Sequence, residues 1–568
     1  MLRDVVGVFL DTVSEREFDA PLLALLAARG FEDVHFLHGA FEFGKDFIAK
    51  GLKSPNQDIG EGDPAGWVPH QFALQSKAGN IGLPQWRDVR PQMDEARLDD
   101  LAHPDFDTRL PRAGVLVLTG RLTGGATVEA QSYRTSELER GRPDFEIWDR
   151  ETLLAWLVDS PEVGLAGTAD GPMLTLAGAI DAGTVTAAQL EKHARRWLPP
   201  TPGTIAAATS NPQDLLVSQR RASVEAAVLA NRLRNSARLD LASFVALHLL
   251  RATWCYALAT QRCVSARPSQ AQAAIRLFAG CATELFREVA PVADDPENFL
   301  RAAVGSPWAL HAVYPAACAR TAEILGLLGL LATTLDDADP LRPLLPDLND
   351  LKATVSSLVV DQPGTAHPIG DSFAVGLIPP VLLVCADHPE SARDFVQRSA
   401  VWVADRHDKD MNGIGLSRTN ASATDEIARL LGGPYVRSAR RRQESYLACV
   451  LSDLGALLSS NTGLYQDVVN EFLAVDIFPQ CITADETRAH WRPGGPGTRL
   501  VAKVEYREPL PANGAAALHF LEPAAPVPAW DAVALASTVR DRHSIAAMKT
   551  FLAQRLPSRN GFRSRRVQ

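Results

Sequence analysis

The sequence is poor in cysteine, and its cysteines are not spaced as metal ligands. Seven cysteines occur, at positions 255, 263, 281, 318, 385, 449 and 481, and none lies earlier in the chain. The absence of a C-x-x-C pair argues against a structural zinc site and against a disulfide framework. We expect most of these cysteines to be small buried hydrophobic residues, and we expect the protein to reside in a reducing cytoplasm.

Long apolar runs and a nucleotide-binding loop are also missing. No uninterrupted apolar run reaches the about 18 residues that suggest a membrane span. The best candidates are 324–335 and 374–386, and Pro379-Pro380 breaks the second. The first residues lack the basic-then-apolar pattern of a signal peptide, so we predict neither a secretory leader nor a membrane span. The pattern G-x-x-x-x-G-K-[ST] does not occur, which excludes a P-loop ATPase within this sequence but not an ATP-driven partner.

Positive charge is scarce in the N-terminal part of the chain. The whole sequence has 57 Lys and Arg against 67 Asp and Glu. Residues 1–160 contain 17 basic and 27 acidic residues, so the remaining 40 of each sign balance. Because phosphate contacts need local positive charge, this is an unfavourable start for nucleic-acid binding. Either the acidic residues serve as metal ligands and cover a face away from the substrate, or the rest of the chain supplies a basic surface.

The hydrophobic pattern divides the chain into three parts. A length of 568 residues suggests about two to four domains. Residues 1–165 alternate between helix and strand patterns, which predicts an α/β domain with a mixed central sheet flanked by helices. From 175 to 480, long Ala-, Leu- and Arg-rich segments predict a mainly α-helical region. We expect this region to sense a signal, bind a partner protein or form a homo-oligomer, although nothing in its sequence names a ligand. Residues 486–568 form a small C-terminal segment with a possible strand at 499–506, a helix at 544–555 and a basic tail.

Within the first part, helices are predicted at 15–29, 89–101, 125–133 and 151–158, and strands at 34–37, 46–49, 72–77, 114–119 and 145–148. The segment GVLVLT at 114–119 is continuously apolar, as expected of a strand buried on both faces. In the second part, helices are predicted at 187–197, 217–237, 241–260, 270–289, 320–335, 349–360, 392–405, 422–431, 441–460 and 463–474.

Three polar residues in the predicted sheet form a candidate catalytic group. Gln75 and Lys77 are alternate residues of one strand, so they project from the same face. If the preceding strand pairs with it, Asp46 points at the same place. A carboxylate, an amide oxygen and a backbone carbonyl suit a hard divalent cation. The cation can polarise a phosphodiester, while an adjacent ammonium stabilises the negative charge that develops. The pattern therefore predicts a hydrolytic site for phosphodiesters.

Five segments in this order resemble the PD-(D/E)XK nuclease superfamily, and within it the Mrr-like restriction endonuclease branch. They are the helix FDAPLLALLAARGF, the turn and strand HGAFEFGKDFIA, the strand FALQSKAGNI, the segment GVLVLTGRLTGGATVEAQSY and the closing FEIWDRETLLAWL. The resemblance covers about residues 15–160. It also extends to the nuclease domains found at the N-terminus of bacterial antiviral effector proteins, where the nuclease is fused to a sensing or assembly region.

The resemblance implies a restriction-endonuclease-like fold and cleavage of DNA that depends on Mg²⁺ or Mn²⁺. In this family pattern Asp46 and Gln75 are the metal-side ligands and Lys77 is the catalytic lysine. Asp19 and Glu42 are possible supporting acids, and Asp19 stands where this branch usually carries Glu. The implied role is a DNA endonuclease that acts as the effector of an anti-phage defence or restriction system.

Other functions fit the same residues. The acidic N-terminal charge and the shortened acid at Asp19 also suit a nuclease-derived binding or assembly module without catalysis. An RNA-directed nuclease is a further alternative, because the metal-dependent chemistry at phosphorus is shared. Each residue also has an ordinary structural role: Asp46 as a turn acid, Lys77 as a strand-end lysine that reaches water, and Asp19 as an acid near a helix start.

Two further motifs lie in the C-terminal half. DKDMNG, with Asp408, Asp410, Asn412 and Gly413, resembles the start of an EF-hand loop. The twelfth position is Thr419, where calcium needs a bidentate Glu, so we predict a surface turn. Two groups of arginines can contact nucleic-acid phosphates or simply form a solvated surface: Arg437, Arg440, Arg441 and Arg442, and the tail residues Arg559, Arg563, Arg565 and Arg566.

Overall fold

The structure, a computed structural model, describes residues 2–37, 44–53, 68–142, 145–166, 171–199, 211–259, 269–299, 313–335, 338–385, 387–408, 415, 443–458 and 463–479. The chain divides into two compact units. The first comprises Met1–Leu174 and Ser223–Val228, and the second comprises Thr175–Ala222 and Leu229–Gln568.

A five-stranded mixed sheet forms the centre of the first unit. Its strands are β1 (Glu32–Phe36), β2 (Phe47–Lys53), β3 (Val68–Lys77), β4 (Arg112–Leu118) and β5 (Phe145–Trp148). They lie side by side in chain order. The pairs β1–β2 and β2–β3 are antiparallel, whereas β3–β4 and β4–β5 are parallel. The predicted α/β domain with a mixed central sheet is therefore confirmed.

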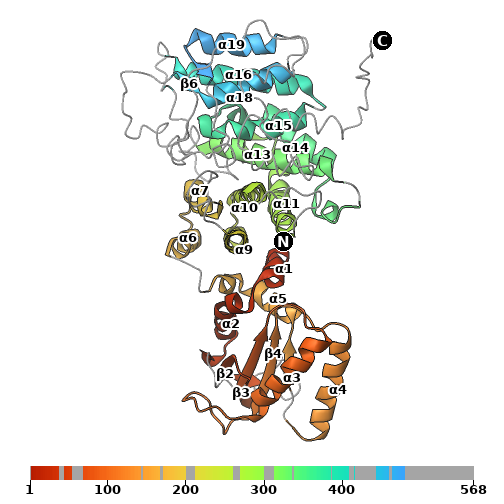
Figure 1. Cartoon of the computed structure of the whole chain (residues 1–568). Coiled ribbons are helices and arrows are strands. Elements are labelled where there is room, and N and C mark those ends of the chain that lie inside the picture. The colour runs from red at the N-terminus through yellow and green to blue at the C-terminus, as the bar shows by residue number, and fades with distance from the viewer. Residues whose placement is uncertain are drawn as a thin grey trace. The chain divides into compact units, whose positions relative to one another are not determined.

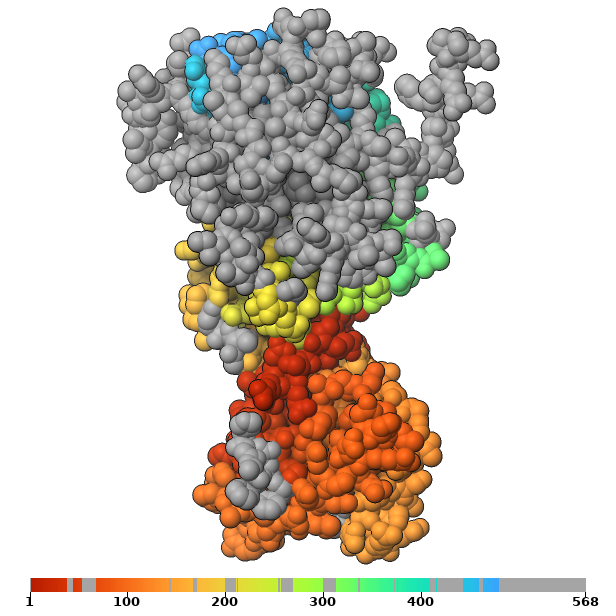
Figure 2. Space-filling view, in the orientation of Figure 1, coloured from red at the N-terminus to blue at the C-terminus, as the bar shows by residue number. Residues whose placement is uncertain are grey.

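Helices cover both faces of this sheet (Figure 1). One face packs on α1 (Leu2–Thr12), α2 (Glu15–Ala28) and α5 (Arg150–Asp159). The other face packs on α3 (Leu83–Leu98) and α4 (Gly125–Glu139), which lie on the side of the unit shown in Figure 2. Alternate residues of β4 supply both cores: Val115 and Val117 face the first set of helices, and Leu116 and Leu118 face the second. This alternation explains the continuous apolar run in the sequence.

Local sequence signals set the ends of the helices that approach the candidate site. The carboxylate of Glu17 accepts a hydrogen bond from the backbone N–H of Ser14 at 3.0 Å, as in a capping box at the start of α2. Asp149 accepts hydrogen bonds from the backbone N–H groups of Glu151 (3.0 Å) and Thr152 (3.3 Å) at the start of α5. Helix α2 begins beside the end of β3, because Glu15 lies 3.1 Å from Lys77, and α5 begins two residues after the end of β5.

Helices dominate the described residues from 171 to 479. They are α6 (Gly171–Asp181), α7 (Ala187–Ala194), α9 (Pro212–Asn235), α10 (Leu239–Ala259), α11 (Ser269–Val289), α13 (Val313–Thr334), α14 (Leu348–Val360), α15 (Ile378–Val384), α16 (Pro389–His407), α18 (Tyr446–Leu458) and α19 (Leu464–Ala474). Two short strands, β6 (Glu444–Ser445) and β7 (Phe478–Pro479), pair in parallel. The predicted mainly helical character of this region is confirmed.

The element predictions differ from the structure in a few places. Helix α3 begins at Leu83 rather than at 89, because Pro84 stands in its first turn, where a missing N–H costs no hydrogen bond. Helix α15 likewise contains prolines in its first turn. Pro379-Pro380 interrupts the apolar run in the sequence, but both prolines are tolerated there because the first N–H groups of a helix have no partner within it. The prediction omitted the helices α1, α6 and α15. The predicted segments 422–431, 499–506 and 544–555 lie outside the described residues.

One helix among the described residues has the length and composition of a membrane span. Helix α13 has 22 residues, a mean hydropathy of 1.4, and 83% of its most apolar window buried inside the protein. Arg320 and Glu323 interrupt its apolar side chains, which is why no long uninterrupted run was visible in the sequence. Burial of this kind is also typical of a core helix, so this helix is weak evidence for a membrane.

Candidate active site

The structure brings Asp46 and Gln75 into direct contact. Strand β2 pairs with β3 so that Phe47 lies opposite Leu74, and Asp46 immediately precedes Phe47. The backbone N–H of Asp46 donates to the carbonyl of Leu74 at 2.8 Å, which extends the pairing by one residue. The Oδ2 atom of Asp46 accepts hydrogen bonds from Nε2 of Gln75 at 2.8 Å and from the backbone N–H of Ser76 at 2.7 Å. The two residues thus adjoin, as expected from strand pairing.

Lys77 follows on the same face of β3, at the last residue of the strand. Its Nζ atom lies 3.1 Å from Oε1 of Glu15, the first residue of α2. The side chains are 24% and 45% exposed, so the pair is open to solvent. Glu15 was not among the predicted site residues. The helix predicted over 15–29 placed it in a first helical turn, but no local pattern showed that this turn approaches the end of β3.

The other predicted site residues have different outcomes. Asp19 is partly buried and lies one helical turn after Glu15 on α2, so both acids belong to the same side of the helix. Glu42 lies outside the described residues, and so do Arg437, Arg440, Arg441, Arg442, Asp410, Asn412, Gly413, Thr419 and the tail arginines. Asp408 directly follows α16.

The segment after Lys77 is fastened to the segment after β4. The backbone N–H of Gly79 donates to Oγ1 of Thr119 at 2.8 Å, and Oδ1 of Asn80 accepts from the backbone N–H of Arg121 at 2.9 Å. A Cβ atom on Gly120 would lie 2.3 Å from the carbonyl carbon of Gly79, so only glycine fits there. These contacts join the Q-S-K-A-G-N-I and T-G-R motifs, and they fix the end of the strand that carries Lys77.

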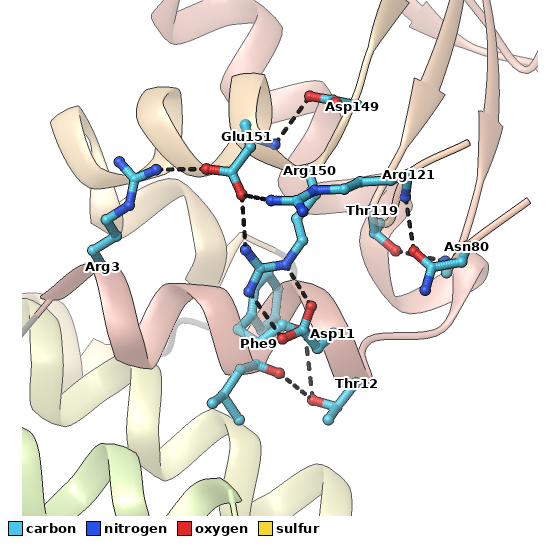
Figure 3. Close-up of polar contacts among 12 residues, drawn as sticks. Arg3, Phe9, Asp11, Thr12, Asn80, Thr119, Arg121, Asp149, Arg150 and Glu151 are labelled. Atoms are coloured by element: carbon cyan, nitrogen blue, oxygen red, sulfur yellow. Dashed lines mark hydrogen bonds and ion pairs between the residues drawn. The ribbon is translucent and has the colours of Figure 1, made fainter. Parts of the chain in front are cut away.

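An arginine-rich cluster lies at the same edge of the sheet (Figure 3). Arg3 of α1 and Arg121 after β4 both donate to the carboxylate of Glu151, and the Arg121 hydrogen bond lowers the pKa of that carboxyl. Arg150 makes two hydrogen bonds to Asp11, at 2.5 and 2.9 Å. Three guanidinium groups thus face two carboxylates. Arg3 is 59% exposed and Arg121 is 54% exposed, so positive charge is accessible here. No local pattern in the sequence predicted this cluster, because its contacts join residues far apart in the chain.

Lys45 is buried immediately before Asp46. Its side chain is inaccessible to solvent, and its Nζ donates to the backbone carbonyl of Glu95 at 3.0 Å. Burial lowers the pKa of Lys45 from 10.5 to about 8, and repulsion from Arg112 acts in the same direction. The ammonium therefore costs free energy in the folded state, and the residue before the candidate metal-binding acid is held rigidly against α3 and its neighbours.

The substitution Lys45→Met should stabilise the first unit near pH 7 and change its pH dependence. The lowered pKa means that the folded state releases a proton that the unfolded state keeps between about pH 8 and 10.5, so wild-type stability should rise with pH across that window. The ammonium costs roughly 3 kcal/mol at neutral pH, and the lost hydrogen bond offsets about 1 kcal/mol of the gain. We expect a net gain of about 1–2 kcal/mol in the free energy of unfolding.

Denaturant unfolding at pH 7 and pH 9.5 measures this effect. Lys50→Met is the control, because Lys50 is 29% exposed and paired with Asp33, so its removal should not stabilise the unit. A Lys45→Met variant that is less stable than wild type at pH 7, with an unchanged pH profile, would refute the assignment of a destabilising buried ammonium.

The side chains of Asp46 and Gln75 fit a hard divalent cation after one rotation. The amide of Gln75 presents its NH₂ group to the carboxylate of Asp46. Turning the amide over presents its oxygen instead, and this terminal torsion is broad and nearly two-fold. A carboxylate oxygen and an amide oxygen on adjoining strands are ligands that Mg²⁺ and Mn²⁺ prefer. Asp46 and Gln75 are therefore the residues that would hold the cation.

A cavity of about 580 Å³ lies elsewhere in the first unit, along β5. Its lining includes Arg134 of α4, Ile147 of β5 and Trp156 of α5, but none of Asp46, Gln75 and Lys77. Of the candidate catalytic residues, Gln75 is buried, whereas the side chain of Lys77 is partly exposed at the end of β3.

Comparison with known proteins gives no relative: no family model, no curated protein sequence and no solved structure matches this chain. The interpretation of the site therefore depends on its own residues and their geometry.

Proposed function

We propose that the first unit is a metal-dependent endonuclease of restriction-endonuclease-like fold, related to the Mrr-like branch of the PD-(D/E)XK superfamily. It hydrolyses DNA phosphodiester bonds as the effector of a bacterial anti-phage defence or restriction system. The observation that carries the proposal is the contact between Asp46 and Gln75 across adjoining strands, with Lys77 two residues further along the same face. In this proposal the helical region senses a signal or assembles the effector.

Each residue of the site has a chemical role in this proposal. A divalent cation held by Asp46 and Gln75 supplies polarisation of the phosphodiester and favours ionisation of a water molecule. The Lys77 ammonium orients the attacking water and stabilises the negative charge that develops on the phosphate. Glu15 is a positioning residue, because its carboxylate holds the Lys77 ammonium at 3.1 Å.

The arginine cluster supports the proposal because it supplies local positive charge in a part of the chain that is acidic overall. The N-terminal 160 residues are acidic in sum, but Arg3, Arg121 and Arg150 gather at the sheet edge where Lys77 ends. Thr119, two residues before Arg121, donates its backbone N–H to the carbonyl of Lys77 at 3.1 Å, which keeps the cluster next to the candidate site. Exposed guanidinium groups are well suited to contact the phosphates that flank a scissile bond.

A second candidate function rests on the orientation of Gln75. Its NH₂ group satisfies the Asp46 carboxylate without any cation, so the same pair also suits a stable, catalytically inactive nuclease fold. Such a module would bind nucleic acid or a partner protein. The metal chemistry does not distinguish DNA from RNA, so RNA is the alternative substrate of the active form.

Cleavage of supercoiled plasmid DNA by the full chain tests the proposal. We expect wild-type protein to nick or linearise DNA with Mg²⁺ or Mn²⁺ and not with EDTA. Asp46→Ala should reduce the rate by at least about 10²-fold, since it removes the sole carboxylate assigned to the cation. Asp107→Ala is the control, because this acid pairs with Arg109 on the loop that precedes β4. A structured RNA of similar length identifies the substrate class.

The outcomes separate the candidates. Metal-dependent cleavage that disappears in Asp46→Ala and persists in Asp107→Ala supports the nuclease. Calorimetric titration with Mn²⁺ decides the case in which wild type does not cleave. Mn²⁺ binding that depends on Asp46 then indicates an enzyme that awaits an activating signal, whereas absence of such binding overturns the proposal in favour of the inactive module.

A further inference from the structure

A second cluster of ligand-type side chains lies in the first unit, apart from Asp46 and Gln75. His35 stands on β1, and His103 and Asp105 stand in the loop between α3 and β4. One ligand atom from each of the three residues lies within 4.8 Å of the others. Nε2 of His35 is 2.9 Å from Oδ2 of Asp105, and Nδ1 of His103 is 3.9 Å from the same oxygen. The two imidazole rings are 4.9 Å apart.

The two histidine–carboxylate separations are near those of a tetrahedral zinc site. Zinc binds histidine nitrogen and carboxylate oxygen at roughly 2.0–2.2 Å, which separates neighbouring ligand atoms by about 3.3 Å. The observed separations of 2.9 and 3.9 Å lie on either side of that value. Nδ1 of His103 also accepts a hydrogen bond from the backbone N–H of Asp105 at 3.2 Å, and it must give up that bond to bind a metal. Two imidazoles with one carboxylate suit a borderline metal, whereas the oxygen pair at Asp46 and Gln75 suits a hard cation. The two sites therefore have different metal preferences.

An irregularity in β1 orients His35 towards the loop. The pairing of β1 with β2 shifts register between Glu32 and His35, and Asp33 adopts a left-handed backbone conformation with φ of 47°. Such bulges re-aim the side chains that follow them, and a left-handed residue other than glycine is strained. As a result His35 lies opposite Ile48, and its ring reaches the loop that follows α3.

The loop that carries the other two ligands is held firmly to the sheet. Oε1 of the buried Gln71 accepts a hydrogen bond from the backbone N–H of Asp107 at 2.8 Å. The backbone N–H of Gln71 donates to the carbonyl oxygen of Pro111 at 2.9 Å. Phe106, next to Asp105, is buried, and the Arg112 guanidinium lies 4.8 Å from its ring centre. Asp105 and His103 therefore project from an anchored segment, which reduces the entropy lost on binding a metal.

Lys50 of β2 interacts electrostatically with Asp105 but forms its hydrogen bond with a different acid. The ammonium of Lys50 hydrogen-bonds Oδ2 of Asp33 at 2.7 Å, and that hydrogen bond raises the pKa of Lys50. Asp105 instead makes its close contacts with the two histidines. The side chains of His35, His103 and Asp105 are 40%, 27% and 39% exposed, so a metal ion and a water ligand can enter from solvent.

We propose that His35, His103 and Asp105 form a transition-metal site, with zinc as the first candidate, in which three protein ligands leave a fourth position open to water. The bound ion fastens the edge strand β1 to the loop between α3 and β4. This site is independent of the proposed nuclease activity and of the Mg²⁺ or Mn²⁺ that the activity needs.

Zinc titration of the tag-free full chain, in competition with a chromophoric chelator, tests the site. Wild type should bind one more equivalent of Zn²⁺ than His35→Ala or His103→Ala, or bind it at least about tenfold more tightly, since even outer-shell changes cost about 10–100-fold in affinity. His70→Ala is the matched control, because His70 lies on β3 outside the cluster and contacts the carbonyl of Val68. Zinc bound by cysteines of the second unit is common to all variants and cancels.

Two further measurements make the result decisive. Co²⁺ should give the visible absorption of a low-coordinate site in wild type and His70→Ala but not in Asp105→Asn, which preserves size and polarity. Zn²⁺ should also slow hydrogen exchange in peptides containing β1, and His103→Ala should abolish this slowing. Equal zinc affinity, stoichiometry and Co²⁺ spectra in all variants would overturn the proposal.

Discussion

Lys77→Ala should reduce the rate constant of metal-dependent DNA cleavage by about 10²–10³-fold, which is the typical effect of removing one group that stabilises a developing negative charge. Lys77 is the last residue of β3, two residues after Gln75. Removal of its ammonium therefore leaves Asp46 and Gln75 in place. Binding of Mn²⁺ should therefore be nearly unchanged, in contrast to Asp46→Ala. Lys77→Arg should give an intermediate rate, because guanidinium keeps the charge but is broader and planar. Single-turnover cleavage measures the rate.

Lys53→Ala is the matched control for Lys77→Ala. Lys53 lies on the neighbouring strand β2, is 23% exposed and forms an ion pair with Glu146, much as Lys77 is 24% exposed and pairs with Glu15. It stands at the opposite end of the β2–β3 pair, opposite Val68. Its removal should leave cleavage unchanged. Equal rates for wild type and Lys77→Ala, or equal losses in the two lysine variants, would contradict a catalytic role for Lys77.

The substitution Glu15→Gln tests whether Glu15 only positions the Lys77 ammonium or is itself needed for cleavage. It keeps the size of the side chain and an oxygen acceptor for Lys77 but removes the negative charge. We expect a smaller loss than for Lys77→Ala, because the pair is partly exposed and such ion pairs contribute little to stability. In the proposed site, Glu15 contributes by orienting the Lys77 ammonium, and single-turnover cleavage measures the loss.

The contact between Asp46 and Gln75 could be predicted from the sequence because it joins two strands that are consecutive in the chain. Alternation along one strand and pairing with the strand before it were enough to bring the two side chains together. The same holds for the two faces of β4 and for the starts of α2 and α5, which were predicted at 15 and 151 and lie at Glu15 and Arg150. In each case a short-range pattern determines which side of an element faces the core, and the pattern lies within one or two elements.

The parts of the site that were missed depend on tertiary approach. Lys77 and Glu15 are 62 positions apart, and Arg3 and Glu151 are 148 positions apart. Neither pair belongs to elements joined by a short turn, so no local pattern predicts the contact. The histidine cluster also needs a bulge in β1 and an irregular loop, and neither follows from periodicity. Such contacts are set by how helices and loops pack on the sheet.

Arg97→Met should be the most destabilising of the single substitutions considered for the first unit. The Arg97 side chain is fully buried on α3 and donates to Glu137 of α4 at 3.1 Å and to Oη of Tyr133 at 3.0 Å. Its aliphatic stem covers Gly114 of β4, where an added Cβ would lie 2.3 Å from Cγ of Arg97. Removal of the guanidinium takes away a positive charge that pairs with the buried carboxylate of Glu137. Breaking a buried ion pair in this way typically costs about 3–5 kcal/mol in the free energy of unfolding.

The pH dependence gives this prediction a second test. Burial raises the pKa of Glu137, but hydrogen bonds from Arg142 and Arg97 outweigh burial, so the net pKa is below 4.5. A lowered carboxyl pKa stabilises the folded state above about pH 4.5, and this stabilisation is lost as the pH falls through the folded-state value. The free-energy difference between wild type and Arg97→Met should therefore be largest near neutral pH and shrink on acidification.

Hydrogen exchange of peptides from α3 and β4 in the full chain measures the loss within the first unit alone. Arg87→Met is the control, since Arg87 is 61% exposed and pairs with Glu129 between the same two helices. An exposed pair contributes about 0–1 kcal/mol, so exchange in this variant should remain close to wild type. Similar protection in both variants would mean that Arg97 contributes through the packing of its stem on β4. Strong loss in Arg97→Met alone would show that the buried charge network joins α3 and α4, the helices that cover one face of the sheet carrying the candidate site.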